Sequence, residues 1–203
     1  MKIRPFDVAK DNVGQACLLI YEAESEIFSR LFRGAKELAL GEIRARLMSR
    51  ETQHSHTHLH VAVDKERMVG ILNAYTGKEK NDHNRGYLEI ARKGDALHRL
   101  PMVAYAWLLG KITIPAIDDK TLYIGDIAVE TASRGCGIGT RLLEYSHSLA
   151  DATGCEREVL EVDVNKDAVR RLYEKNGFVA VEKKTLPIAG GYYHMERRTG
   201  KRP

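Results

Sequence analysis

Three alternating glycines lie in the segment Arg134-Gly135-Cys136-Gly137-Ile138-Gly139-Thr140. Glycine has no Cβ, so the backbone N–H groups of such a segment can come close to a bound ligand. The residues that follow have helical spacing, and the start of a helix adds unpaired N–H donors and a partial positive charge. Together with the full charges of Arg134 and Arg141, this segment predicts a site for a phosphate or pyrophosphate.

Several nucleotide-binding families use a glycine-rich segment of this kind. A Walker loop ends in Gly-Lys-Ser/Thr, whereas Gly139 is followed by Thr140 and Arg141, so that loop is excluded. A dinucleotide fingerprint needs glycine where Thr140 stands, although Glu161 is near the distance expected of a ribose-binding acid.

An S-adenosylmethionine-dependent methyltransferase is the less favoured alternative, with Glu161 or Asp163 as its ribose-binding acid. Its glycine motif should follow a strand directly, but residues 130–134 separate the glycines from the apolar run that ends at Val129. The chain also ends 64 residues after Gly139, which is too short for the rest of such a sheet.

The elements on the N-terminal side of the glycines can be predicted from apolar spacing. Helical spacing predicts one helix from Val13 to Phe32, begun by Asp11-Asn12 and ended near Gly34, and a second over 38–48. The runs Leu59–Val63 and Met68–Tyr75 predict two strands of a hairpin, joined by the charged turn 64–67. Residues 76–86 read as a loop, and weak helical spacing predicts a helical insertion around 87–113.

The C-terminal third has clearer patterns. A strand over Leu122–Val129 should lead through the glycines into a helix over Gly137–Thr153, closed by Gly154 as a left-handed C-cap. We expect three further strands, over Val159–Val164, Phe178–Val181 and Tyr192–Arg197. We also expect one short helix, which Asn165 caps and which ends at Asn176-Gly177.

From Tyr123 to Phe178 the sequence resembles the GNAT superfamily of acyl-CoA-dependent N-acetyltransferases. The phosphate loop of that family, Arg/Gln-x-x-Gly-x-Gly/Ala, matches Arg134, Gly137 and Gly139. The segment Leu172-Tyr173-Glu174-Lys175-Asn176-Gly177-Phe178 resembles the helix-to-strand signature that follows it. The resemblance implies a mixed α/β fold: one domain over residues 1–203, with a central, mostly antiparallel, splayed sheet flanked by helices.

The resemblance also implies acetyl-CoA as cosubstrate, no metal, and acetyl transfer to a primary amine by direct attack. Arg134 and the backbone amides of the loop would hold the CoA pyrophosphate; those amides belong to Gly135, Cys136, Gly137, Ile138, Gly139 and Thr140. The main chain of Ile127, Ala128 and Val129 would pair with the pantetheine arm, and Asn165 would lie near that arm. The alternative function, which involves no catalysis, is that of a module that binds or senses acyl-CoA.

Two side chains are candidates for proton transfer in that reaction. Tyr173 would be the general acid that protonates the leaving thiolate, because an ordinary phenol has a pKa close enough to that of a thiol. Asp126, a carboxylate inside the strand beside the cofactor, would be the general base. Glu161 and Asp163 are its rivals, and Tyr123 stands where some family members carry a carboxylate.

Two other reactive groups attract attention. His54, His56, His58 and His60 would share one face of an extended chain, with a spacing that could bind zinc or nickel. No other ligand cluster stands near them in the sequence, so we expect no functional metal site there. Cys136 at a helix start resembles a nucleophile, but no catalytic partner is identifiable, and we expect a loop residue.

Length, charge and cysteine content fit such a protein. The 203 residues suit one domain, and three unrelated cysteines predict free thiols in a reducing cytoplasm. Residues 1–7 lack the apolar run of a signal peptide, and the apolar stretch 100–110 is about half of a membrane span. A net charge of +4 suits an acidic ligand but not nucleic acid. We therefore expect a cytoplasmic protein with a small-molecule or peptide amine acceptor, no nucleic-acid or membrane partner, and room for a homodimer.

Overall fold

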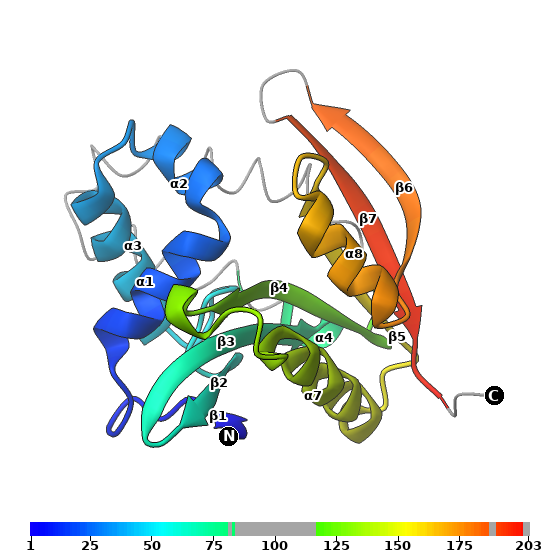
Figure 1. Ribbon diagram of the computed structural model, residues 1–203, viewed down its shortest axis with the longest axis horizontal. Helices are drawn as coiled ribbons and strands as arrows, with labels where there is room; N and C mark the ends of the chain where they lie inside the picture. The colour runs from blue at the N-terminus through cyan, green and yellow to red at the C-terminus, as the bar shows by residue number, and fades with distance from the viewer. Residues whose placement is uncertain (81–82, 84–116, 187–189, 201–203) are drawn as a thin grey trace.

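A seven-stranded sheet runs through the part of the chain that the computed structural model describes, which is residues 1–80, 83, 117–186 and 190–200 (Figure 1). Its strand order is β1-β2-β3-β4-β5-β7-β6, and all neighbours are antiparallel except the parallel pair β4–β5. This is the mixed, mostly antiparallel sheet that the sequence predicts. The strands are β1 (Lys2–Pro5), β2 (Leu59–Asp64), β3 (Arg67–Thr76), β4 (Thr121–Val129), β5 (Arg157–Asp163), β6 (Val179–Leu186) and β7 (Gly190–Arg198).

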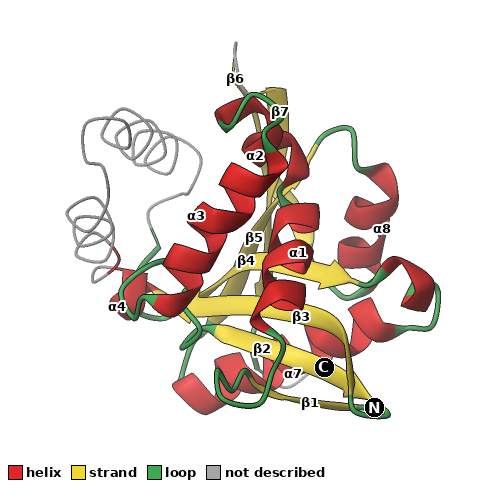
Figure 2. Ribbon diagram, turned by 90° about the vertical axis from the view of Figure 1, so that its left-hand side faces the viewer, coloured by secondary structure: helices red, strands yellow, loops and turns green. Residues whose placement is uncertain are grey.

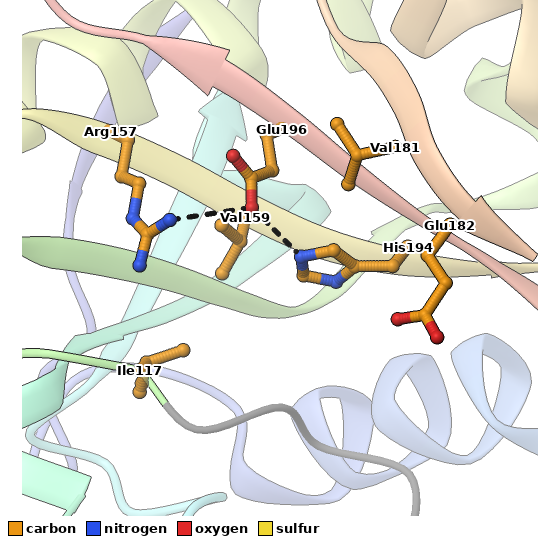
Figure 3. Close-up of a pocket in the computed structure, with 7 residues that line it drawn as sticks. All are labelled: Ile117, Arg157, Val159, Val181, Glu182, His194 and Glu196. Atoms are coloured by element: carbon orange, nitrogen blue, oxygen red, sulfur yellow. Dashed lines mark hydrogen bonds and ion pairs between the residues drawn. The ribbon is translucent and has the colours of Figure 1, made fainter.

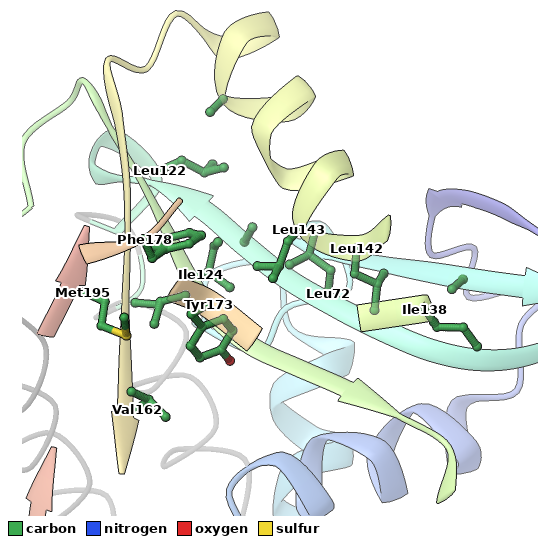
Figure 4. Close-up of a cluster of buried hydrophobic side chains, with 14 of the residues drawn as sticks. Leu72, Leu122, Ile124, Ile138, Leu142, Leu143, Val162, Tyr173, Phe178 and Met195 are labelled. Carbon is green, nitrogen blue, oxygen red and sulfur yellow. The ribbon is translucent and has the colours of Figure 1, made fainter. Parts of the chain in front are cut away.

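Helices cover both faces of the sheet (Figures 1 and 2). One face carries α1, α2 and α3, whose core includes Ile20, Phe28, Ile43, Val61 and Ile71. The other carries α7 and α8, whose core includes Leu72, Ile124, Leu142, Leu160 and Met195 (Figure 4). The described helices are α1 (Val13–Ala23), α2 (Ser25–Leu31), α3 (Lys36–Met48), α4 (Gly77–Lys80), α7 (Ile138–Thr153) and α8 (Asp167–Lys175), with a 3-10 turn over Thr131–Ser133.

The parallel strands β4 and β5 pair over a very short length. Their register joins Thr121–Tyr123 to Arg157–Val159 and extends no further within the described residues. Beyond that point β4 continues beside β3 as far as Val129, and β5 continues beside β7. The two halves of the sheet therefore open away from each other, as Figure 1 shows for β4 and the β7–β6 pair.

A bulge in β4 stands at the start of this opening. Asn73 of β3 pairs with Asp126, but the next residue, Ala74, pairs with Ile124, which leaves Gly125 as an extra residue. A Cβ at Gly125 would lie 3.1 Å from Nδ2 of Asn73. Glycine at this position therefore leaves room for an amide side chain that contacts Asp126.

Most of the predicted elements are confirmed. The helix predicted over 38–48, the hairpin and the strands and helix around the glycines are present, and Asn12 caps α1 by accepting from the Gln15 N–H at 3.0 Å. Gly154 closes α7 in the left-handed conformation, with φ +71°. The predicted insertion around 87–113 lies outside the described residues. In the segment 76–86, which the sequence predicts as a loop, residues 77–80 form the short helix α4.

Two helix predictions are wrong in detail. The single helix predicted over Val13–Phe32 is broken at Glu24, where α1 ends and α2 begins. Asn165 does not cap α8, because the N-cap position belongs to Lys166 and makes no side-chain capping bond. The Asn165 N–H instead donates to Oδ1 of Asp163 at 2.7 Å, which fixes the turn before the helix.

A buried ion pair joins the β5–β7 half of the sheet to α7. Glu158 is fully buried and accepts from the Arg197 guanidinium, from Ser146 and from His147. The same guanidinium donates to the carbonyls of Leu143 and Asn176. One charged pair therefore holds two strands, α7 and the end of α8 in fixed positions.

The Arg197→Met variant should be strongly destabilised. It leaves the Glu158 carboxylate buried without its counter-ion, and breaking a buried pair in this way costs about 3–5 kcal/mol. Urea denaturation followed by circular dichroism measures the loss. The neighbouring exposed Arg198 provides the control, since Arg198→Met should change the free energy of unfolding by about 0.5 kcal/mol or less. Equal effects of the two substitutions would contradict this assignment.

Candidate active site

The glycine loop stands exposed before α7. Gly135 and Gly137 have φ values of +79° and +75°, a conformation that side chains other than glycine rarely adopt. A Cβ built at either glycine would meet no described atom within 4 Å, so the space above the loop is open. The 16-residue α7 begins at the next residue, Ile138, with its first N–H groups unpaired by a side-chain cap. The loop therefore fits a phosphate group.

Two residues of the predicted phosphate loop also have structural contacts. A Cβ at Gly139 would lie 3.1 Å from Cδ2 of Leu172, so this third glycine lets α7 approach α8 closely. Arg134 donates from Nε to the Val129 carbonyl at 3.0 Å and pairs with Glu22 at 3.1 Å. These contacts hold the loop against the end of β4 and against α1.

The backbone of β4 borders the opening of the sheet. Ile127, Ala128 and Val129 pair with β3 on one side, and the described strand β5 has already diverged on the other. Apart from the Val129 carbonyl, which accepts from Nε of Arg134, the backbone N–H and C=O groups that face that side can bind an extended ligand as an added strand would. The glycine loop and this edge are continuous, so one ligand could contact both.

Tyr173 lies on α8 within the core between the sheet and α7–α8. It is 8% exposed and lies beside Phe178, and Figure 4 shows its phenolic oxygen directed away from that ring. Burial, with a smaller contribution from the charge of Asp126, raises the pKa of the Tyr173 phenol above its ordinary value. The phenol is therefore protonated at neutral pH, and its pKa lies further from that of a thiol than the pKa of an ordinary phenol does.

Asp126 follows the bulge and lies on the α1–α3 side of β4. It is 2% exposed, and its Oδ2 accepts from Nδ2 of Asn73 at 2.9 Å. The Nε2 of His54 lies 3.5 Å from this same oxygen and 3.5 Å from Oε2 of Glu24. Sequence reasoning missed Glu24 and His54 as neighbours of Asp126, because the three residues come from segments far apart in the chain.

The charges in this group affect one another. Burial, followed by the nearby charge of Glu24, raises the pKa of Asp126 to about 6, although His54 and Asn73 act in the opposite direction. Burial also acts to raise the pKa of Glu24, but contact with His54 and the charges of Arg46 and Lys166 outweigh it and lower that pKa. Asp126 is therefore a carboxylate that can take up a proton near neutral pH.

Glu161 belongs to a second polar group on the same face. Its Oε2 accepts from the Tyr123 hydroxyl, and its Oε1 contacts Nδ1 of His194 at 3.0 Å. His194 also contacts Glu196 at 3.1 Å through Nε2. These hydrogen bonds raise the pKa of His194, the bond to Glu161 most strongly, although burial opposes them.

A cavity of about 390 Å³ opens beside this second group (Figure 3). Figure 3 shows the His194 ring, the Glu196 carboxylate and the Arg157 guanidinium in a continuous row along its wall. Tyr123 and Glu161 lie where β4 and β5 separate, and Glu161 contacts His194, the first residue of this row. The hydrogen bonds therefore run from the opening of the sheet to the cavity. Its lining residues are Ile117, Arg157, Val159, Val181, Glu182, His194 and Glu196.

Comparison with known proteins identifies the family. The model of the family described as "Acetyltransferase (GNAT) family" matches residues 19–178. The chain belongs to the GNAT acetyltransferase family. A stretch of 61 residues is 36% identical to N-alpha-acetyltransferase 30 of Saccharomyces cerevisiae, which is 30% of this chain and 35% of that protein. The chain thus covers about a third of this curated relative.

Solved structures share the GNAT fold over almost the whole chain. An acetyltransferase matches with a TM-score of 0.68 at 18% identity, covering 98% of this chain and all of that one. An N-acetyltransferase from Staphylococcus aureus Mu50 matches with a TM-score of 0.68 at 20% identity, covering 97% and 100%. Ard1 from Thermoplasma volcanium matches with a TM-score of 0.56 at 15% identity, covering 98% of each chain. At these identities the likeness concerns the fold.

The topology of the sheet argues against the two other families that the glycine motif resembles. A methyltransferase or dinucleotide-binding domain is built on a mostly parallel sheet, whereas only β4 and β5 run parallel among the described neighbours. Of the helices that the structure describes, none has the length and apolar character needed to span a membrane.

The remaining candidate residues are dispersed. Asp163 accepts from the Asn165 backbone and faces the turn before α8. Cys136 is exposed in the glycine loop, and Cys17 and Cys155 are buried, all three as free thiols. The four histidines do not share one face, because residues 54–58 form turns and only His60 lies in β2. His56 contacts the Leu47 carbonyl, His58 contacts His83, and His60 packs against Tyr145.

The Asp126→Asn variant should be more stable than the parent at high pH. A folded-state pKa of about 6 lies above the ordinary value near 4, so the parent loses stability as the pH rises from about 4 through 6. The neutral amide removes that cost, and we expect a gain of about 2 kcal/mol at pH 8 that disappears at pH 4. Thermal unfolding across this pH range measures the effect.

The exposed Asp151 on α7 supplies the control, since Asp151→Asn should leave the pH dependence of stability unchanged. A variant Asp126→Asn that is less stable than the parent at pH 8 would show that the carboxylate stabilises the fold.

Proposed function

We propose that this protein is an N-acetyltransferase that transfers the acetyl group of acetyl-CoA to a primary amine by direct attack. The observation that carries the proposal is the arrangement at the opening of the sheet. The glycine loop and the edge of β4 adjoin this opening, Tyr173 belongs to the α8 side of the sheet, and Asp126 belongs to the α1–α3 side, close enough for its charge to act on the Tyr173 phenol. One side chain can donate a proton there and the other can accept one.

The residues present fit acetyl-CoA as cosubstrate. The exposed glycines Gly135 and Gly137, with open space above them and a helix start behind, suit the pyrophosphate. The main chain of Ile127, Ala128 and Val129 suits the amide-bearing pantetheine arm, and Asn165 would lie near that arm. Acetyl-CoA supplies an activated thioester, and backbone N–H groups of β4 would stabilise the negative charge that develops on its carbonyl oxygen.

In this proposal the general base and the general acid lie on opposite faces of the sheet. Asp126, with a pKa of about 6, would accept the proton of the attacking amine, and it is charged at neutral pH. Tyr173 would donate its proton to the departing CoA thiolate, since burial keeps the phenol protonated. Glu161 is the rival base, because it lies on the same face and already accepts from Tyr123.

The acceptor would be a cationic amine, supplied by a small molecule or a peptide. Carboxylates outnumber basic groups among these described residues: Glu24, Asp126 and Glu161 lie on the α1–α3 face, and Glu182 and Glu196 line the cavity beside Arg157 and His194. This excess of negative charge favours a positively charged partner. The identity with N-alpha-acetyltransferase 30 over 61 residues supports testing peptide N-termini first.

Acetyl-CoA and CoA should stabilise the purified chain, whereas S-adenosylmethionine and NAD should not. A ligand at 100 times its dissociation constant adds about 2.7 kcal/mol, which a thermal-shift titration detects easily. Gly137→Ala should abolish this response, because the added Cβ strains a left-handed residue in the loop. Gly34 is the matched control: its φ of +81° is similar and its surroundings are open, but it lies between α2 and α3. Gly34→Ala should keep the full response.

The Tyr173→Phe variant should turn over at least about 100-fold more slowly while binding acetyl-CoA as tightly as the parent. Release of free thiol from acetyl-CoA in the presence of a peptide or small amine measures turnover. Tyr145→Phe on α7 serves as control, since this ring packs against His60 away from the opening. Full activity of Tyr173→Phe would remove Tyr173 from the mechanism.

Comparison of Asp126→Asn with Glu161→Gln should identify the base. We expect the parent's kcat/KM to fall about tenfold per pH unit below pH 6, and Asp126→Asn to lose both the rate and this pH dependence. Loss of the pH dependence in Glu161→Gln alone would assign the base to Glu161. Turnover of no amine by a parent protein that binds acetyl-CoA would favour the acyl-CoA-binding module.

A further inference from the structure

Three potential metal ligands meet on the α1–α3 face of the sheet. Glu24 ends α1, His54 lies in the turns between α3 and β2, and Asp126 follows the bulge in β4. One ligand atom from each residue can be chosen so that all three atoms lie within 4.8 Å of one another. Segments separated by 30 and 72 positions in the sequence therefore converge on one point.

The spacing of these atoms suits a small divalent cation. Zinc binds imidazole nitrogen and carboxylate oxygen at about 2.1 Å in a tetrahedral arrangement, which places neighbouring ligand atoms about 3.4 Å apart. The Nε2 of His54 lies 3.5 Å from Oε2 of Glu24 and 3.5 Å from Oδ2 of Asp126. These separations are long for hydrogen bonds but close to those of two ligands on one ion.

Burial and missing hydrogen bonds also point to a cation. His54 and Asp126 are each 2% exposed, and Oδ1 of Asp126 is buried with no hydrogen-bond partner among the described residues. Asn73 contributes one neutral donor, to the other oxygen. A buried carboxylate with one oxygen unsatisfied is costly unless a positive group lies against it.

We propose that Glu24, His54 and Asp126 form a site for a divalent cation of the zinc type. Two carboxylates and a neutral imidazole would offset the charge of such an ion, and water would fill the fourth position. The Glu24 side chain is 24% exposed, so the site has a route to solvent. The run of histidines itself supplies one ligand, His54, while the other two come from residues that sequence spacing does not connect with it.

The residues around His54 and Glu24 determine the affinity for the cation that we expect. A metal-bound imidazole is usually oriented by a partner on its other nitrogen, and losing such a partner weakens metal binding about 10–100-fold. Here Nδ1 of His54 is buried without a partner among the described residues. The positive charges of Arg46 and Lys166 also act on Glu24. We therefore expect micromolar affinity, suited to reversible occupation.

Occupation of this site would inhibit acetyl transfer, a consequence that rests on the proposed function. The ion would bind the carboxylate of Asp126, which is assigned to accept the proton of the amine. A bound cation would also repel a cationic acceptor. Inhibition should therefore compete with the amine and leave acetyl-CoA binding unchanged.

The first experiment measures metal binding directly, without turnover. The full chain, free of affinity tag and carrying Cys136→Ser to remove its exposed thiol, is titrated with zinc in competition with a chromogenic zinc chelator. We expect one equivalent to bind, and His54→Ala and Asp126→Asn each to weaken binding about tenfold or more. Asp126→Asn preserves side-chain shape, so it tests the site even if His54→Ala fails to fold.

His56→Ala is the matched control, because His56 lies two residues from His54 and contacts the Leu47 carbonyl. It should bind zinc as the parent does. The inference is overturned if the parent binds no stoichiometric zinc at micromolar concentration, if His54→Ala and Asp126→Asn bind it unchanged, or if His56→Ala weakens binding equally.

Assays of turnover separate this inference from the proposed function. A chain that acetylates an amine but does not bind zinc would overturn the metal site and keep the enzyme. A chain that binds one zinc through His54 and Asp126 but acetylates no amine would keep the metal site and overturn the enzyme.

Discussion

The short pairing of β4 with β5 is the constraint on which the rest of the structure depends. Only three residues of each strand are joined, and each strand then follows its other neighbour. A sheet cannot separate in this way without leaving backbone groups unpaired, and these groups need another partner. The edge of β4, the glycine loop and the start of α7 all adjoin that opening, so a single extended ligand can satisfy groups from each.

Each half of the divided sheet is held rigid by different means. The β5–β7 half carries the buried Glu158–Arg197 pair, whose hydrogen bonds reach α7 and the end of α8. The β4 half is held by its long antiparallel pairing with β3 and by the packing of α1 against both strands. Backbone pairing between the halves ends at residue 123, and the core on the α7–α8 face, which contains Ile124 of β4 and Leu160 of β5, holds the two halves together across the opening.

Several ionisable side chains lie close together around Asp126, on the α1–α3 face of β4. A buried carboxylate with a raised pKa weakens the fold at neutral pH, and carboxylates of this kind cluster at functional sites. The break between α1 and α2 at Glu24 adds to this arrangement. It frees the Ala23 carbonyl to accept from Nζ of Lys166 at 3.2 Å, and it places the Glu24 carboxylate beside His54.

The sequence by itself determined most of the elements and the glycine loop before α7. Helical and alternating periodicity located α3, α7 and most strands, and the spacing of Arg134, Gly137 and Gly139 identified the family, because these features depend on neighbours in the chain. The tertiary structure alone decided the break at Glu24, the bulge at Gly125 and the meeting of Glu24, His54 and Asp126. These depend on which faces pack together across the sheet, and periodicity along one segment carries no information about its distant partners.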